Sequence, residues 1–374
     1  MAVKPVQLLA ILVMAALVAA VIEGASYLAG RELERRGVFY SPGEVVDFAE
    51  YLSTRDPVLG WPSPASFGTQ DRDETGSRVI PAFDDTREAC VSLYGNSFTW
   101  GGEVDNTQAW SNVLSQLMSC RVSNFGVGGY GSDQAYLRFL GNTGDGAPDV
   151  VLGHLSENIL RNLAQLRDLL YPGSFGLKPR FLLREDGQLA QLPLPTYTEE
   201  EYREVVARPE DHLEHDWFVP GGPAGIQRLR FPFSLSVLGA FRNFHVQAKL
   251  RGRPWYADFY AADHPAGGLD LTAAILVAFR DEALRRGRRP LILLIPTGLD
   301  LSHFAEHGEW VYQPLLDRLE ETGARPLNAG AGIMAELGAR DPCELFTHCS
   351  QHFNAEGYAL LARVVHEELR RRRR

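Results

Sequence analysis

Four short, almost uninterrupted apolar runs recur between amphipathic stretches from residue 89 onward. The runs are CVSLY, RVSNF, DVVLGHL and PLILLIP, and helical spacing lies between them near residues 109–119, 133–140 and 272–286. Strands that are apolar on both faces are typical of a parallel sheet covered by helices on both sides. We therefore predict a doubly wound, flavodoxin-like α/β fold for residues 89–374.

The first residues form a separate apolar segment. Residues 6–22 carry no charge and one polar side chain, and Glu23 interrupts the run. A membrane-spanning helix needs about 20 apolar residues, so a helix that continues past Glu23 is long enough. A signal peptide is the alternative, but its apolar core is shorter, and Glu23 lies among the small residues Ala20 and Ala25 of a cleavage site. We predict that residues 1–30 are an uncleaved membrane anchor.

Two further segments lack sustained periodicity. Residues 31–88 alternate charges, Pro and Gly and are predicted to form an irregular juxtamembrane collar. Residues 164–269 are rich in Pro and charge, and we predict an insertion between core elements, part of which folds over the rim of the sheet as a lid. Aromatic residues of the insertion are candidates either for stacking on sugar rings or for the core; they are Phe241, Phe244, Trp255, Tyr256, Phe259 and Tyr260.

The net charge argues against one class of partner. The chain has 37 Lys and Arg against 47 Asp and Glu, which gives a net charge of −10 at pH 7. Such a surface repels phosphate backbones. We therefore predict no nucleic-acid partner.

The four cysteines bear on the compartment. Cys90 and Cys120 begin two strands that are predicted to be neighbours, while Cys343 and Cys349 lie close together in a late loop. Each pair could form a disulfide, although four cysteines allow three connectivities and free buried thiols are an alternative. The arginines that follow the apolar segment favour a cytoplasmic body by the positive-inside rule. We place more weight on the cysteines and predict an extracytoplasmic domain.

The loops that follow the predicted strands are the first places to look for chemistry. In an open α/β sheet, ligands bind beyond the carboxyl ends of the strands. Ser97 lies on a tight turn between a strand and a helix, where its hydroxyl is exposed and the N–H groups of the helix can face an anion. A simple helix cap is the alternative role for this serine.

The second loop, residues 124–131, is rich in glycine. It matches G-x-G-x-x-G, but a dinucleotide site expects this motif after the first strand, and here it follows the second. We predict no nucleotide cofactor. Glycines such as Gly129 can instead bring a backbone N–H close to a reacting centre, as an oxyanion donor requires.

Two later loops complete the set. Residues 153–158 end in Asn158, whose amide can reach the same pocket, and His352 stands just ahead of the last predicted helix. A single histidine at such a position is often a helix cap or a surface group. Because three of the loops follow successive strands and the fourth lies just before the last helix, they converge at one edge of the sheet.

Together these loops resemble the SGNH (GDSL-like) hydrolase superfamily over about residues 89–162 and 270–367. YGNSFTWG stands at the G-D-S block, NFGVGGYGSDQ at the glycine block, GHLSEN at the G-x-N-D block and HFNAEGY at the H-P-N-x-x-G ending. The resemblance implies a serine esterase or O-acyltransferase without a cofactor, acting on acyl esters such as those of cell-surface glycans. It assigns Ser97 as nucleophile, His352 as general base, and the Ser97 and Gly129 N–H groups with the Asn158 amide as the oxyanion hole.

Three positions depart from the family pattern. Asn96 replaces an Asp beside the nucleophile. In the third block, the family's N-D pair can align with Glu157 and Asn158, which would put Glu157 at the position of the oxyanion amide; we predict instead that Asn158 is this amide. Cys349 stands three residues before His352, where the family has the acidic member of the triad. A backbone carbonyl, or a carboxylate such as Asp341 or Glu344, would have to replace it. The alternative is a catalytically weak domain that binds a polysaccharide or a protein.

The same loop contains possible zinc ligands, namely Cys343, His348, Cys349 and His352. Usual zinc motifs have two well-separated pairs of ligands, whereas these four crowd into one short loop. A metal on His352 would also occupy the lone pair that a general base needs. We predict no metal site.

Overall fold

The computed structural model describes residues 5–42, 47–83, 88–173 and 176–374. Its centre is a parallel sheet in the order β2-β1-β3-β6-β7, formed by β1 (Val91–Tyr94), β2 (Val122–Asn124), β3 (Asp149–Leu155), β6 (Arg289–Ile295) and β7 (Leu327–Asn328). This order is the flavodoxin-like arrangement, so the predicted α/β fold is confirmed.

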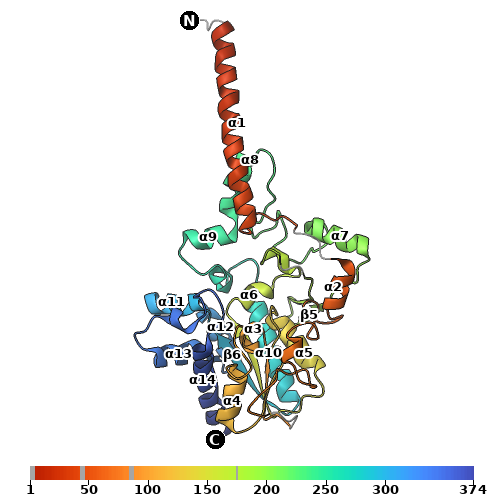
Figure 1. Cartoon of the computed structure of the whole chain (residues 1–374), viewed down its shortest axis with the longest axis vertical. Coiled ribbons are helices and arrows are strands. Elements are labelled where there is room, and N and C mark those ends of the chain that lie inside the picture. The colour runs from red at the N-terminus through yellow and green to blue at the C-terminus, as the bar shows by residue number, and fades with distance from the viewer. Residues whose placement is uncertain (1–4, 43–46, 84–87, 174–175) are drawn as a thin grey trace. The chain divides into compact units, whose positions relative to one another are not determined.

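Helices cover the sheet on both faces (Figure 1). One group that packs together is α4 (Trp110–Met118), α13 (Ala329–Leu337) and α14 (Ala355–Arg373), and the other is α5 (Ser132–Gly141), α10 (Gly268–Arg285) and α12 (Gln313–Glu321). The predicted helices near 109–119, 133–140 and 272–286 are thus present, with boundaries shifted by one to four residues.

The strands are buried from end to end because their side chains face helices on both sides. Every residue of β1, β2 and β3 is buried, and β3 pairs with β6 over its whole length, from Asp149 opposite Arg289 to Leu155 opposite Ile295. This explains why the strands appear in the sequence as continuous apolar runs rather than as alternating patterns.

The disulfides lie in this part of the chain. Cys90 and Cys120 are joined, with their Cα atoms 6.1 Å apart, just before the paired residues Val91 and Val122. Cys343 and Cys349 form the second bridge. The pairing of the cysteines within each group is confirmed, and the alternative of free thiols is wrong.

Contacts divide the described residues into two compact units. The larger holds the sheet, α2 (Phe48–Thr54), the short helices α3 (Ser97–Trp100) and α6 (Asn158–Arg161), α11 (Gly298–His307) and the antiparallel pair β4 (Arg180–Leu183) and β5 (Leu189–Leu192). The smaller comprises residues 1–46, 166–175 and 197–255, with α1 (Pro5–Arg35), α7 (Glu199–Ala207), α8 (Phe233–Gly239) and α9 (Phe244–Leu250).

Residues 31–88 contain regular structure that the absence of periodicity did not predict. α1 continues to Arg35, and α2 begins after Asp47, whose side chain accepts hydrogen bonds from the N–H groups of Ala49 and Glu50. A seven-residue helix is too short to show a clear period, so its cap is the better signal. In the insertion, Tyr256, Phe259 and Tyr260 are buried and therefore belong to the core.

Helix α1 is long and apolar enough to cross a membrane. Its apolar side chains are exposed along most of its length, and Gly30 is its buried residue. The smaller unit holds the end of α1 through the segment that follows it: the Tyr40 hydroxyl donates to the Val206 carbonyl at 2.7 Å, and the Asn243 amide donates to the Val38 carbonyl at 3.0 Å.

Candidate active site

Ser97 is the first residue of α3, directly beyond the carboxyl end of β1. The side chain of Asn96 caps this helix by accepting a hydrogen bond from the Phe98 N–H at 2.9 Å. The turn is tight, because a Cβ at Gly95 would lie 2.9 Å from the Gly153 carbonyl oxygen. Ser97 is half-buried among buried neighbours, so its hydroxyl remains accessible.

His352 lies opposite this serine. It precedes α14, whose N-cap Asn354 accepts a hydrogen bond from the Gly357 N–H at 3.0 Å. Nε2 of His352 is 2.7 Å from Oγ of Ser97, although the two residues are 255 positions apart in the chain. The distance is within the range over which a histidine can remove a proton from a serine.

Glu103 contacts the other nitrogen of the imidazole. Its Oε1 lies 2.9 Å from Nδ1 of His352, and its second oxygen accepts a hydrogen bond from the Thr347 hydroxyl. Partial burial opposes ionisation, but the hydrogen bonds from Thr347 and His352 outweigh it and hold the pKa of Glu103 below its ordinary value. An ionised carboxylate at Nδ1 directs the lone pair of Nε2 toward Ser97.

The backbone at Glu103 is also unusual. Its φ is +65°, in the left-handed region that residues with a side chain rarely adopt. The preceding Gly102 leaves room for the histidine, because a Cβ there would lie 3.2 Å from Nε2 of His352. Such conformations occur where the surrounding structure requires them, often at functional sites.

Glu103, rather than a residue at the position of Cys349, supplies a carboxylate beside His352. Cys349 is in a disulfide and cannot orient the histidine, and the two carboxylates considered from the sequence have other partners: Asp341 accepts from the Cys343 N–H at 2.9 Å, and Glu344 pairs with Arg340 at 2.9 Å. Sequence reasoning missed Glu103 because it searched near the histidine. The signal was the Gly-Gly-Glu that follows the serine helix.

Asn158, rather than Glu157, faces the nucleophile loop. Its Oδ1 accepts a hydrogen bond from Nδ2 of Asn96 at 3.0 Å, and it is fully buried. Nδ2 of Asn158 is buried and has no hydrogen-bond partner among the described residues. The Glu157 carboxylate instead pairs with Arg161 at 2.7 Å. The Nδ2 amide group of Asn158 is therefore a hydrogen-bond donor that the described residues leave unused, beside the turn that carries Ser97.

Gly129 lies in the loop after β2. This loop is hydrogen-bonded to the turn that carries Ser97. The Val127 N–H donates to the Gly95 carbonyl at 3.0 Å, two residues from Ser97 and two from Gly129. Gly129 has a φ of +83°, which favours glycine at this position. The structure thus brings the loops of Ser97, Gly129 and Asn158 to one edge of the sheet.

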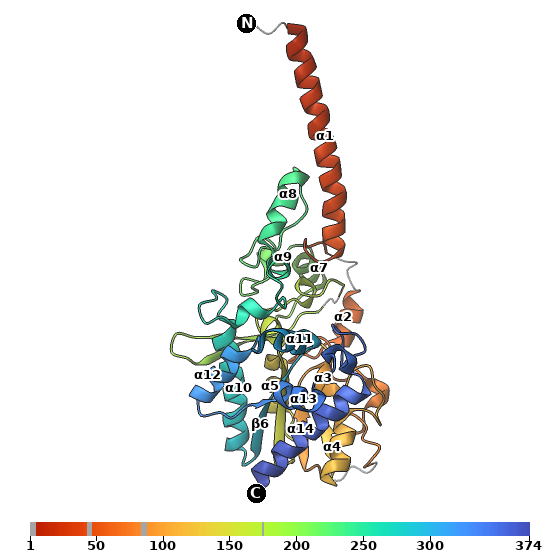
Figure 2. The same ribbon diagram turned by 90° about the vertical axis from the view of Figure 1, so that its left-hand side faces the viewer.

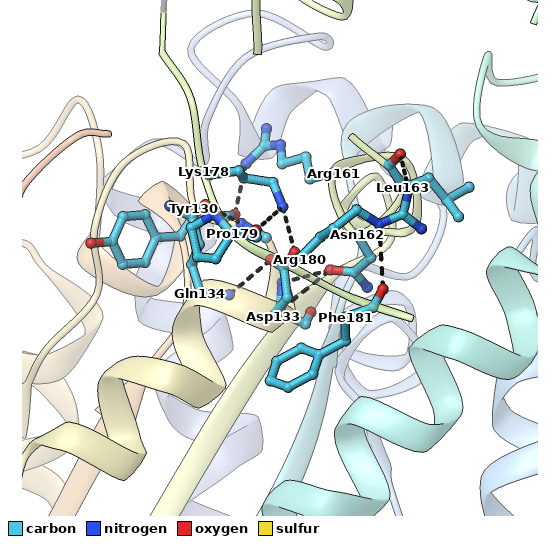
Figure 3. A network of polar contacts seen from close by, with 12 residues as sticks. Tyr130, Asp133, Gln134, Arg161, Asn162, Leu163, Lys178, Pro179, Arg180 and Phe181 are labelled. Atoms are coloured by element: carbon cyan, nitrogen blue, oxygen red, sulfur yellow. Dashed lines mark hydrogen bonds and ion pairs between the residues drawn. The ribbon is translucent and has the colours of Figure 1, made fainter. Parts of the chain in front are cut away.

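A polar network joins the Gly129 loop to α6 (Figure 3). The Arg161 guanidinium donates to the Tyr130 carbonyl at 3.3 Å while it pairs with Glu157, and Lys178 pairs with Asp133 in a buried ion pair. Asn162 accepts from the Ser132 N–H at 3.0 Å. The network fixes the loop that follows Gly129 against the helix that begins with Asn158.

A second serine–histidine pair lies elsewhere in the same unit. Oγ of Ser132 is 2.7 Å from Nδ1 of His154, but both residues are fully buried, and the Tyr260 hydroxyl lies 3.1 Å from Nε2. Burial lowers the pKa of His154 to about 3, so this imidazole stays neutral. The pair is closed to a substrate and belongs to the core.

The zinc ligands considered from the sequence are not all available. Cys343 and Cys349 share a disulfide, so neither sulfur is a thiolate, and His352 contacts Ser97 and Glu103 with its two nitrogens. No group of three metal-binding side chains occurs within residues 5–42, 47–83, 88–173 and 176–374.

Comparison with known proteins points to one group of solved structures. No protein-family model and no curated protein matches the chain. Similar structures include a lipolytic protein of the G-D-S-L family from Veillonella parvula, with 11% identity, a TM-score of 0.37 and coverage of 74% of this chain and 96% of the other. The acetylxylan esterase Axe2 from Geobacillus stearothermophilus has 11% identity, a TM-score of 0.39 and coverage of 75% and 94%. The likeness concerns the fold alone.

Proposed function

We propose that this chain is an SGNH-like serine esterase in which Ser97, His352 and Glu103 form the catalytic triad. The observation that carries the proposal is the continuous hydrogen-bonded chain from Oγ of Ser97 through the imidazole to Glu103, with distances of 2.7 and 2.9 Å. A half-buried serine, a histidine and a carboxylate in this order are the arrangement that activates a hydroxyl for attack on a carbonyl.

In the proposed mechanism, Oγ of Ser97 attacks the ester carbonyl while Nε2 of His352 accepts the hydroxyl proton. Glu103 holds Nδ1–H and stabilises the imidazolium that forms. The tetrahedral oxyanion is stabilised by the N–H groups of Ser97 and Gly129 and by Nδ2 of Asn158, which has no partner among the described residues. His352 then protonates the leaving alkoxide, and an acyl-enzyme remains on Ser97.

The second half-reaction determines the product class. Water attacking the acyl-enzyme gives an esterase, whereas a sugar hydroxyl gives an O-acyltransferase, with the same residues in the same roles. We propose hydrolysis as the basic activity and acyl groups on a cell-surface glycan as the substrate. Incubation with an aryl acetate, with and without an oligosaccharide acceptor, separates the two outcomes by the appearance of acylated sugar.

The alternative function was binding without turnover. It was motivated by the cysteine at the usual position of the acidic residue, and Glu103 now supplies a carboxylate at Nδ1 of His352. Catalysis therefore has all three groups that it requires.

We also propose that α1 anchors the protein in a membrane. The larger unit, which holds Ser97 and His352 and is called the catalytic unit in this proposal, would then lie on the extracytoplasmic side. The two disulfides support this side, because such bonds form and persist in oxidising compartments. Protease added to intact spheroplasts is expected to degrade the catalytic unit. Degradation only after lysis would place the unit in the cytoplasm.

The first prediction tests the nucleophile. A fluorophosphonate probe is expected to label the wild-type protein, and Ser97→Ala is expected to abolish the label because, in the part of the chain that the structure describes, no other hydroxyl contacts the imidazole of His352. Ser132→Ala is the matched control, since this serine also contacts a histidine but is buried. Wild-type protein without label, or equal label on Ser97→Ala, would refute the esterase.

A further inference from the structure

Residues 228–241, the hairpin that lies next to α1, carry apolar side chains that the described residues of its own unit leave exposed. Residues 228–232 lead into α8, and α8 lies alongside α1 in both views (Figures 1 and 2). The rings of Tyr27 and Phe233 are 5.0 Å apart, and a Cβ at Gly30 would lie 3.2 Å from Cγ of Leu229. The hairpin and α1 belong to one compact unit.

The side chains at the tip and along one side of α8 face outward. Phe231 is 73% exposed, Leu235 and Leu238 are each 63% exposed, and Phe241 is 53% exposed. Single exposed apolar residues are normal, but this group continues the bare apolar surface of α1. Exposed apolar patches of this kind mark sites that contact a membrane or another protein.

Glu23 explains how the hairpin is held. Its Oε2 accepts hydrogen bonds from the N–H groups of Phe233 at 2.5 Å and Ser234 at 3.3 Å, and its other oxygen accepts from the Ser234 hydroxyl. In a bilayer the first N–H groups of a helix have no water to bond to and need an internal partner. The Glu23 carboxylate, the one charge within the apolar part of α1, therefore accepts hydrogen bonds from the first N–H groups of α8.

Arginines border residues 231–241 at both ends. Arg230 precedes Phe231, Arg242 follows Phe241, and both are exposed. Residues 217–257 contain no Asp or Glu, in a chain with a net charge of −10. Arginines beside an apolar segment are typical of elements that lie at a membrane surface with anionic headgroups.

We propose that residues 231–241 are a second membrane-contacting element, which enters the boundary between headgroups and acyl chains beside α1, with Arg230 and Arg242 at anionic phospholipid headgroups. An apolar segment of this length is too short to span a bilayer, so it lies in the interface. The inference rests on the proposed role of α1 as an anchor, because cleavage near Ala25 would remove Glu23.

The test uses the full chain in vesicles of phosphatidylcholine, with and without phosphatidylglycerol. An environment-sensitive fluorophore is attached to single cysteines introduced by Leu235→Cys or Leu238→Cys, with the native disulfides intact. Both labels are expected to shift to shorter wavelength and to be quenched by nitroxide-bearing lipids. Glu199→Cys, on the exposed face of α7, is the matched control and is expected to show neither effect.

A label at Leu12 separates the possible failures. If the Leu12→Cys label is quenched and the Leu235 label is not, the anchor stands and the hairpin inference is wrong. If neither is quenched, the anchor itself is wrong. A Leu235 label that shifts to shorter wavelength without quenching by lipid would show contact with a second copy of this chain in place of the bilayer and would also overturn the inference.

The arginines provide the second arm of the test. Arg230→Gln/Arg242→Gln is expected to remove the increase in quenching that phosphatidylglycerol causes at Leu235, because the electrostatic attraction is lost. Arg203→Gln on α7 is the control and is expected to keep it. An unchanged response in the double variant would refute the role of anionic headgroups.

Discussion

Glu103 contacts the site through the imidazole of His352. It contacts Nδ1 of His352, whereas Ser97 contacts Nε2. In the proposed triad, Glu103 orients the imidazole and stabilises its charged form, which depends on the ionised carboxylate and not on side-chain shape alone.

The second prediction follows from this role. Glu103→Gln is expected to lower kcat by about 10³- to 10⁴-fold with little change in KM, because the neutral amide favours the wrong tautomer and no longer stabilises the imidazolium. Steady-state hydrolysis of an aryl acetate measures the effect. Glu344→Gln is the control, since this exposed carboxylate lies in the loop before His352 but pairs with Arg340; an equal loss in both variants would contradict the assignment.

The proposed oxyanion donors depend on how the elements beneath them pack. The ion pair between Lys178 and Asp133 is nearly inaccessible to solvent, with 6% and 0% of the two side chains exposed. It lies next to the Gly129 loop in the network that joins this loop to α6 (Figure 3).

The third prediction concerns this pair. Lys178→Met is expected to reduce the free energy of unfolding by about 3–5 kcal/mol, because it leaves the Asp133 carboxylate buried without its cation. Lys178→Met/Asp133→Asn is expected to recover most of the loss. Urea unfolding monitored by circular dichroism measures both, with Lys249→Met on the exposed end of α9 as control. A single variant as stable as the control would show that the pair is not needed.

Helix α11 begins with a buried carboxylate. Asp300 accepts hydrogen bonds from the Thr297 N–H at 2.7 Å and from the Ser156 hydroxyl. Burial raises its pKa to about 6, so the folded chain holds this proton more tightly than the unfolded chain. Stability from this group is therefore present below about pH 4 and is lost as the pH rises through about 6.

The fourth prediction is the removal of this pH dependence. Between pH 4.5 and 7, the wild-type protein is expected to lose about 2 kcal/mol more of its unfolding free energy than Asp300→Asn does. Urea unfolding at the two pH values measures the difference. Asp281→Asn, whose side chain is 57% exposed, is expected to follow the wild type. Parallel curves for wild type and Asp300→Asn would contradict the ionisation assigned to Asp300.

At the scale of the whole chain, two disulfides lie in the larger unit, and they differ in what they constrain. The Cys90–Cys120 bridge closes a separation of 30 residues at the start of two strands. The Cys343–Cys349 bridge closes a separation of six residues in the loop that also carries Thr347. The first therefore restricts the unfolded chain more. The second closes the loop whose Thr347 hydroxyl donates to Glu103.

The fifth prediction contrasts the two. Cys90→Ser/Cys120→Ser is expected to lower the free energy of unfolding by about 3–4 kcal/mol and to leave kcat of the folded protein unchanged. Cys343→Ser/Cys349→Ser is expected to lower stability less, by about 2–3 kcal/mol, but to reduce kcat. Paired unfolding and aryl acetate assays measure both. The reverse pattern would refute the separation of roles.

Sequence order alone determined the sheet and the meeting of Ser97 with His352 at one edge. The reason is that the carboxyl ends of parallel strands lie at one edge of the sheet, where the covering helices begin. Loops that follow successive strands and the residue just before the last helix therefore converge there. The apolar runs, the glycine turn before Ser97 and the cap before α14 are all local signals that a single chain displays.

Other features were decided only when the chain was packed. Glu103 reaches a histidine 249 residues away, Asn158 rather than Glu157 turns toward Asn96, and Glu23 bonds the start of a helix 210 residues later. Each depends on side-chain direction and on distances between separate elements. These are fixed by tertiary packing, and no local pattern of residue types encodes them.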